Sequence, residues 1–145
     1  MSDRRSVRLE RTSTGNYLAT NAAGVNVPLG MGDDVFSPVE LLLAAIGGCS
    51  AIDVDVVTSR RGEPDHFAVE VSAGKVVDET GGSRLQDVVA DFRVAFGSDE
   101  RAREAAGLVE RLIRLSHDRD CTVSRTVELP TRVRMDLAGR PVVGE

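Results

Sequence analysis

The feature that most constrains the fold is an almost wholly apolar stretch, residues 38–52, which stands directly behind a helix-start signal. Ser37 suits the N-cap position, Pro38 suits the first helical position, and Glu40 completes a capping box three residues after the serine. A helix is therefore predicted from here to about Ser59. Because its apolar residues occur nearly all round, we expect this helix to lie in the middle of the protein.

The segments on either side of this helix have the patterns of strands. Residues 7–27 alternate weakly and contain turn signals at Gly15 and Gly24, which predicts short strands. Residues 66–77 and 85–96 alternate more regularly, each with one apolar face, and a Gly-containing loop separates them. This pattern predicts a hairpin with one face on the core.

A second helix and a last strand complete the predicted order. Residues 98–100 form a capping signal, and apolar residues follow at helical spacing up to residue 115. A final strand is expected over residues 126–137. The order βββ-α-ββ-α-β, with short loops, predicts one α+β domain over residues 1–145, built on antiparallel sheet.

Composition and charge exclude several classes of protein. The formal net charge is -5 and no segment concentrates basic residues, which argues against a nucleic-acid partner. Residues 1–5 lead into a polar segment without an apolar core, so no secretory signal is expected and the cytoplasm is the predicted location. The run of apolar residues 39–52 is too short to span a bilayer, so no membrane partner is expected.

The chain has two cysteines, Cys49 and Cys121, and each lies beside a predicted helix. Their positions suggest a thiol pair that meets in the fold. A reactive thiol needs a lowered pKa because the thiolate is the nucleophile. The dipole of the first helix cannot supply this, since Cys49 lies roughly 18 Å beyond its N-cap. Asp53, one turn further on, would by itself raise the pKa of Cys49.

Two interpretations stay open for each cysteine. Cys49 could be a buried, unreactive thiol, but Gly47 and Gly48 favour function: a mid-helix glycine costs about 1 kcal/mol relative to alanine and marks close approach of a backbone or a substrate. Cys121 follows the polar residues 118–120, which indicate an exposed turn suited to a resolving thiol. The alternative for Cys121 is a partly buried residue that caps the core.

Three carboxylates have structural explanations beside their chemical ones. Glu40 could act as a general base, but the capping box already accounts for it. Asp53 and Asp55 lie in an apolar helix, so each needs a partner or access to the surface. The candidate partners are Arg60, Arg61 and Arg125.

The two histidines do not complete a recognisable site. His66, His117 and the cysteines match no zinc spacing, and neither a metal nor another cofactor is expected. His117 stands four residues before Cys121, which raises the possibility of a thiol hydrolase. Such an enzyme also needs an orienting group and an oxyanion site, and the sequence reveals neither.

Two motifs resemble a known family. Residues 37–54 (SPVELLLAAIGGCSAIDV) and residues 121–124 (CTVS) resemble the OsmC/Ohr family of osmotically induced and organic-hydroperoxide-resistance proteins, and in particular its less characterised OsmC-like branch. The resemblance implies antiparallel sheets wrapped around two central helices in an intertwined homodimer. It also implies that Cys49 is the peroxidatic thiol and Cys121 the resolving thiol, with a disulfide formed during turnover.

The groups that activate the thiolate in family members do not carry over. The peroxidases of the family place a Glu directly after the helix-starting Pro, whereas Val39 stands there in this chain and Glu40 comes about 100° further round the helix. Family members also carry an Arg in the N-terminal strands, but residues 12–59 contain neither Arg nor Lys. The remaining candidates for the cation are Arg8, Arg11 and Arg125.

Two functions follow from these observations. The first is a cytosolic thiol-dependent peroxidase of the oxidative stress response, which reduces organic hydroperoxides through Cys49 and Cys121 and is regenerated by a dithiol reductant. The second is an OsmC-like module that binds a small molecule or senses redox state without efficient turnover. The missing Arg and the displaced Glu favour the second function, and the thiol pair favours the first.

Overall fold

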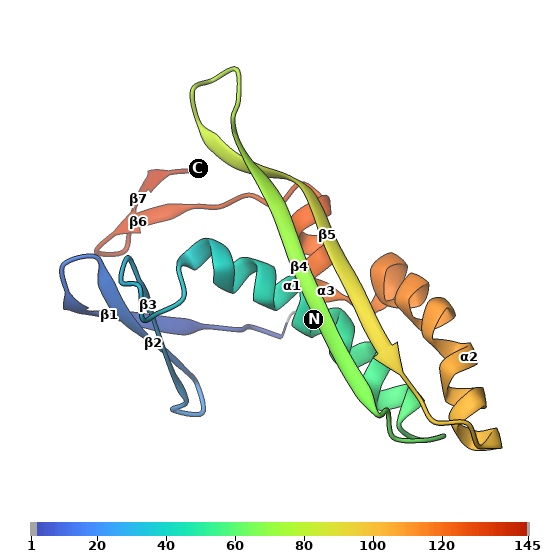
Figure 1. Cartoon of the computed structure of the whole chain (residues 1–145). Helices are drawn as coiled ribbons and strands as arrows, with labels where there is room; N and C mark the ends of the chain where they lie inside the picture. The colour runs from blue at the N-terminus through green and yellow to red at the C-terminus, as the bar shows by residue number, and fades with distance from the viewer. Residues whose placement is uncertain (1–2, 145) are drawn as a thin grey trace. The chain divides into compact units, whose positions relative to one another are not determined.

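The computed structural model describes residues 3–144. Its antiparallel sheets and helices confirm the predicted α+β class (Figure 1). The described residues form two compact units that divide between Ala45 and Ile46, within the longest helix. A single domain over residues 1–145 stays a prediction, and residues 1, 2 and 145 lie outside the described part.

The first unit holds a three-stranded antiparallel sheet. β1 (Val7–Ser13) pairs with β2 (Asn16–Asn21), which pairs with β3 (Asn26–Gly30). Gly15 and Gly24, in the turns between them, have φ angles of 74° and 83°, which residues with a side chain rarely adopt. The short strands predicted for this segment are confirmed.

The long helix α1 (Pro38–Thr58) begins at the predicted capping box. The Ser37 N–H donates to Oε1 of Glu40, and the Glu40 N–H donates to the Ser37 hydroxyl oxygen, both at 3.1 Å. α1 has 21 residues with a mean hydropathy of 1.8 in its most apolar window, so by length and composition alone it could cross a membrane. Residues 39–52 alone are shorter than a bilayer requires, and the core helix of a soluble protein passes the same test of length and composition, so the expectation of no membrane partner is not contradicted.

One stripe of α1 is buried and the rest is not. The buried residues of the helix are Ile46, Gly47, Ser50, Val54 and Thr58. In contrast, the apolar side chains of Ile52 and Val56 are 64% and 52% exposed. The expected position in the middle of the protein therefore holds for one face of the helix in this single chain, because the other elements cover only the face that carries Val54.

The second unit contains the predicted hairpin. β4 (His66–Val77) and β5 (Ser83–Ala95) pair in antiparallel register, with a bulge at which Asp87 has a φ of 52°. Phe67 and Phe92 meet edge to face on the inner side, with ring centroids 6.2 Å apart. One-sided burial of the alternating residues confirms the two strands predicted from their pattern.

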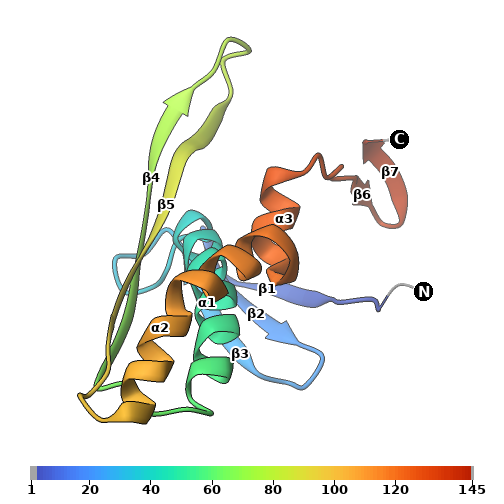
Figure 2. The same ribbon diagram turned by 90° about the vertical axis from the view of Figure 1, so that its right-hand side faces the viewer.

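The helix α2 (Glu100–Leu115) lies beside the C-terminal part of α1, and the hairpin crosses one side of both helices (Figure 2). The Ala102 N–H donates to the Asp99 carboxylate at 2.9 Å, which confirms the predicted cap. Gly47 lets α1 approach the hairpin, since a Cβ placed there would lie 2.5 Å from Cγ2 of Val71. The core of this unit lies between these three elements.

The chain after α2 differs from the prediction. The π-helix η1 (Ser116–Asp120) continues α2, and α3 (Thr122–Glu128) follows it. β6 (Met135–Leu137) and β7 (Arg140–Val143) then form a short hairpin. The strand expected over residues 126–137 is wrong except for its last three residues, because Cys121 caps a helix that runs through the first three of them.

Candidate functional site

Both cysteines belong to the second unit and both are free thiols. Cys49 is half-buried on α1, one residue before the buried Ser50. Cys121 is fully buried at the N-cap of α3. The expectation that Cys121 lies in an exposed turn is wrong: the side chains at 118–120 are exposed, but η1 turns the next residue inward.

The ends of α1, η1 and α3 are held together by hydrogen bonds around Ser116. The Ser116 hydroxyl donates to Oδ2 of Asp53 at 2.7 Å, which ties α1 to the end of α2. The Ser116 carbonyl accepts from the Cys121 N–H, also at 2.7 Å. The connection brings Cys121 to α1, close enough to Cys49 that each thiol shifts the pKa of the other.

Cys121 is the more acidic thiol. Burial raises the pKa of Cys121, but hydrogen bonds outweigh it and lower the pKa to about 7. The thiol and the Ser124 hydroxyl oxygen lie 3.2 Å apart, and the Ser124 N–H donates to Sγ of Cys121 at 3.3 Å. The neighbouring side chains of Ser50 and Cys49 also lower the pKa of Cys121. Together these neighbours favour a negative charge on this sulfur.

Cys49 is the less acidic thiol. Burial is the main cause of its raised pKa, and the Val123 N–H, which donates to the sulfur, opposes it. The Cys121 side chain and the negative charge of Asp53 raise the pKa of Cys49 further. The predicted effect of Asp53 is thus confirmed in direction. Together the two thiols form a pair that loses its first proton near neutral pH and keeps the second.

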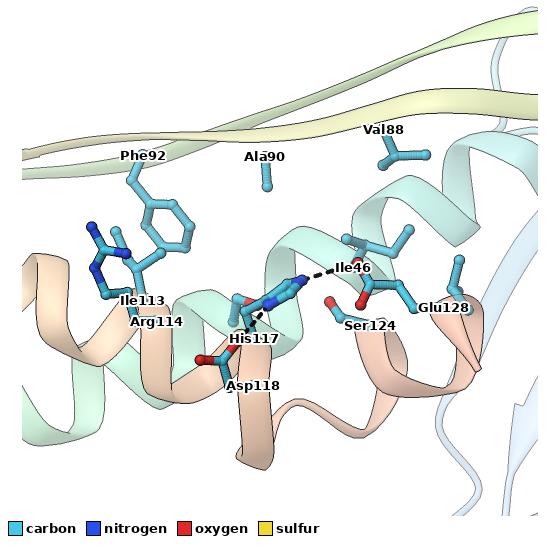
Figure 3. Close-up of a pocket in the computed structure, with 12 residues that line it drawn as sticks. Ile46, Val88, Ala90, Phe92, Ile113, Arg114, His117, Asp118, Ser124 and Glu128 are labelled. Atoms are coloured by element: carbon cyan, nitrogen blue, oxygen red, sulfur yellow. Dashed lines mark hydrogen bonds and ion pairs between the residues drawn. The ribbon is translucent and has the colours of Figure 1, made fainter.

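A cavity of about 390 Å³ lies next to Ser50 and Ser124, and neither cysteine is among its lining residues. One wall is the inner face of β5, with Val88, Ala90 and Phe92, and the other is formed by the helices (Figure 3). Ser50 and Ser124, the two serines that lower the pKa of Cys121, line it. The remaining lining residues are Ile46, Ile113, Arg114, His117, Asp118, Val127 and Glu128. The cavity is therefore largely apolar and reaches the groups that contact the thiol pair.

His117 stands at the edge of this cavity between two carboxylates (Figure 3). Its Nδ1 lies 2.9 Å from Oδ1 of Asp118, and its Nε2 lies 2.9 Å from Oε1 of Glu128. Hydrogen bonds to Asp118 and Glu128 and their charges raise the pKa of His117. Since both ring nitrogens face carboxylates, His117 is not arranged as a base for Cys121, and the arrangement does not support a thiol hydrolase.

The other predicted residues have partners of their own. Glu40 is engaged in the capping box, and the bond from the Ser37 N–H holds the pKa of this carboxyl below its ordinary value. Arg125 donates to the Asp118 carbonyl oxygen at 2.7 Å. In the N-terminal sheet, Arg8 pairs with Glu10 at 3.3 Å and Arg11 donates to Thr14 at 2.9 Å.

The partners expected for the aspartates of α1 are wrong. Asp53 accepts from Ser116, and Asp55 accepts from the Ser59 hydroxyl at 2.9 Å. Serines within reach replace the arginines proposed for this role. His66 lies exposed at the start of β4. Within residues 3–144 no cluster of three or more His, Cys, Asp or Glu side chains is arranged to hold a metal ion.

The sequence profile described as OsmC-like protein matches residues 31–136, which include both cysteines. This chain belongs to the OsmC-like protein family. The chain is also 30% identical over 132 residues to the uncharacterized protein Rv2923c of Mycobacterium tuberculosis, covering 89% of this chain and 93% of that protein.

Solved structures show the same fold. A hypothetical protein from Aquifex aeolicus VF5 is 21% identical with a TM-score of 0.70, covering 88% of this chain and 89% of that one. The organic hydroperoxide resistance protein OhrB of Bacillus subtilis is 21% identical with a TM-score of 0.56, and the match covers 86% of this chain and 90% of OhrB. The resemblance to OsmC/Ohr proteins is confirmed at the level of family and fold.

Sequence reasoning missed three residues of this OsmC-like site: Ser50, Ser116 and Ser124. Two of them left a signal. Ser50 directly follows Cys49, and Ser124 stands three residues after Cys121, the spacing at which an N-cap side chain bonds a backbone N–H. Ser116 left none, since its bond to Asp53 joins residues 63 apart in the chain.

Proposed function

We propose that this OsmC-like protein is a thiol-dependent peroxidase that reduces organic hydroperoxides with Cys49 and Cys121. The observation that carries the proposal is that Cys49 and Cys121 lie close enough for each thiol to shift the pKa of the other, with the pKa of Cys121 lowered to about 7. Membership of the family supports a redox role in peroxide resistance, as the name of OhrB indicates for that protein.

Cys49 is the thiol that meets the peroxide, because it is half-buried whereas Cys121 is fully buried. Its oxidation gives a sulfenic acid, and condensation with Cys121 gives a disulfide and water. A dithiol reductant then returns both cysteines to thiols by two exchange steps. The mutual effect of the two thiols on their pKa values supports this sequence, because it requires the sulfurs to be near each other, as disulfide formation does.

The cavity next to Ser50 and Ser124 supports an organic substrate over hydrogen peroxide. Val88, Ala90 and Phe92 offer an apolar wall, and burial of an alkyl or aryl group there contributes about 25 cal/mol per Å² of apolar surface removed from water. Hydrogen peroxide has no such group. We expect the preference to appear as a lower KM for the bulkier hydroperoxide.

Two further features belong to the proposal. The protein acts as a homodimer, because the exposed apolar residues of α1, Ile52 and Val56, form a surface that a second copy would remove from water. It works in the cytoplasm, where free cysteines are kept reduced between turnovers. No organic cofactor takes part in the proposed reaction.

The test is consumption of cumene hydroperoxide by the reduced protein with a dithiol reductant. Cys49→Ser is expected to abolish turnover. Cys121→Ser is expected to leave one stoichiometric oxidation and no cycle. Ser83→Ala, at an exposed position at the start of β5, is the control and is expected to match the original protein. Full steady-state turnover by Cys49→Ser would refute the peroxidase.

A second candidate function is a ligand-binding or redox-sensing module. The raised pKa of Cys49 favours it, because a protonated thiol reacts slowly with peroxides. A small molecule retained in native mass spectrometry, together with slow oxidation that stops after one equivalent, would support this alternative. Rapid turnover that depends on Cys49 would exclude it.

A further inference from the structure

The short helix α3 is lightly held. None of its residues 122–128 is buried, and Cys121, at its N-cap, is the buried residue that anchors it. Cys121 and Leu129, which flank the helix, both have extended backbone, so α3 is continuous neither with η1 nor with the chain that follows. A short helix without a buried face depends on single bonds for its position, and such elements open at low cost.

The bonds that hold α3 to η1 lie on one face of the helix. Cys121, Arg125 and Glu128 are four and three residues apart, so they face the same way. The Arg125 guanidinium donates to the Asp118 carbonyl oxygen at 2.7 Å. Nε2 of His117 lies 2.9 Å from Oε1 of Glu128 (Figure 3). Of these two bonds, the one made by His117 is sensitive to pH in the neutral range.

The geometry around His117 requires a protonated ring. Its Nδ1 lies 2.9 Å from Oδ1 of Asp118, so both ring nitrogens face carboxylate oxygens. An ionised carboxylate only accepts, and a neutral imidazole has one N–H, so neutral His117 would turn a lone pair toward one of the two carboxylates. Both bonds together need the imidazolium. The bonds to Asp118 and Glu128 raise the pKa of His117 accordingly.

Other charged side chains near His117 have partners of their own. Those closest in the sequence, together with Asp53 of α1, form the pairs Arg114–Glu110, Arg119–Asp120 and Ser116–Asp53. The facing wall of the cavity, on β5, is apolar, with Val88, Ala90 and Phe92. The positive charge of His117 is therefore balanced by Asp118 and Glu128.

α3 covers both a buried thiol and one side of the cavity. Its first turn lies on Cys121, with the N–H and the hydroxyl oxygen of Ser124 at 3.3 and 3.2 Å from Sγ. The Cys121 side chain is fully buried. Ser124, Val127 and Glu128 line the cavity. Movement of α3 away from η1 would therefore uncover Cys121 and open the cavity on this side.

We propose that α3 is a lid over Cys121 and the apolar cavity, and that protonated His117 is the latch that holds it shut. When His117 loses its proton, its bond to Glu128 is either lost or becomes a neutral bond, which is weaker than a charge-assisted one. The lid therefore opens more often as the pH rises. Access to Cys121 goes beyond the proposed peroxidase, and only its use, to admit a hydroperoxide or a dithiol reductant, rests on that function.

The experiment measures access to Cys121 directly. Cys49→Ser leaves Cys121 as the single thiol of the chain, and N-ethylmaleimide alkylates it at a rate proportional to the population of the open lid. Cys121 titrates in the same pH range, so each variant is compared with Cys49→Ser at the same pH, and the ratio of the two rates is the readout. Low ionic strength is used because the His117 side chain is 55% exposed and salt screens such pairs.

The latch variants are made in the Cys49→Ser protein. At about pH 5.5, where the latch is protonated, His117→Gln and Glu128→Gln are expected to speed alkylation about two- to fivefold, the effect of an exposed ion pair. Both ratios should fall toward one as the pH rises through the raised pKa of His117, because the parent lid then opens too. His66→Gln, at an exposed histidine at the start of β4, is the control and should leave the rate unchanged at every pH.

His117→Arg distinguishes a latch from a loss of local structure. A guanidinium keeps its charge across the pH range, so this variant should match its parent at low pH and be alkylated about two- to fivefold more slowly at high pH. A disrupted α3 could not make Cys121 less accessible. The latch would be overturned by unchanged rates in both Gln variants at low pH, by ratios that do not vary with pH, or by a His117→Arg protein alkylated at high pH as fast as its parent.

Turnover of cumene hydroperoxide by the same latch variants, with Cys49 restored, separates this inference from the peroxidase. Alkylation needs no peroxide. The expected alkylation ratios without peroxide turnover would refute the peroxidase and retain the lid. Peroxide turnover without those ratios would retain the peroxidase and overturn the lid.

Discussion

Substitution of Gly47 and Gly48 by alanine separates two neighbouring glycines of α1 that the sequence cannot distinguish. Helix propensity alone predicts that each substitution stabilises the protein by about 1 kcal/mol. The added Cβ at Gly47 would lie 2.5 Å from Cγ2 of Val71 and 3.6 Å from Cγ1 of Val69. At Gly48, an exposed position, no atom lies within 4 Å of the added Cβ. The change in the free energy of unfolding should therefore have opposite signs in the two variants.

The magnitude at Gly47 follows from two opposing effects. Val71 is β-branched and stiff about χ1, so α1 or β4 must move to admit the methyl group. Overpacking of this kind costs about 1–3 kcal/mol, which the propensity gain of about 1 kcal/mol only partly offsets. We expect Gly47→Ala to lower the free energy of unfolding by about 1 kcal/mol and Gly48→Ala to raise it by a similar amount.

Urea unfolding followed by circular dichroism measures both variants. The midpoint should fall for Gly47→Ala and rise for Gly48→Ala, with unchanged slopes. In Gly47→Ala/Val71→Ala the valine methyl groups that meet the added Cβ are gone, so the two substitutions should be less costly together than the sum of their separate effects. Additive effects, or a Gly47→Ala protein as stable as Gly48→Ala, would refute the argument from close approach.

Three further predictions concern single bonds. His117→Gln should remove a part of the stability that depends on pH. Because the pKa of His117 is raised in the folded protein, its contribution to stability is complete below about pH 6.5 and is lost as the pH rises through the folded-state pKa. Urea midpoints measured across a pH series would detect this loss. Asp53→Asn should lower the pKa of Cys49 by removing a nearby negative charge, so alkylation of Cys49 at neutral pH should be faster than in the original protein. Glu40→Ala should break the bond from the Ser37 N–H and lower the urea midpoint, and an unchanged midpoint would contradict the capping box.

The predictions that succeeded rest on local signals. The capping box at Ser37 and Glu40 predicts the start of α1 because both bonds join residues three apart. The alternation of β4 predicts its bounds because side-chain direction in a strand has a period of two. The wrong strand after residue 126 has the same local origin: the helix that replaces it begins at a thiol cap, and cysteine is not among the usual N-cap residues.

The sequence by itself determined the α+β class, the family, and the two thiols as the chemical candidates. It also predicted the effect of Asp53 on Cys49, because the two lie one helical turn apart. Only the tertiary structure decided which sulfur is the acidic one. The pKa of Cys121 depends on burial and on Ser50, a residue distant in the sequence that lies near Cys121 in the fold. Such contacts between distant residues follow from packing and leave no pattern in the sequence.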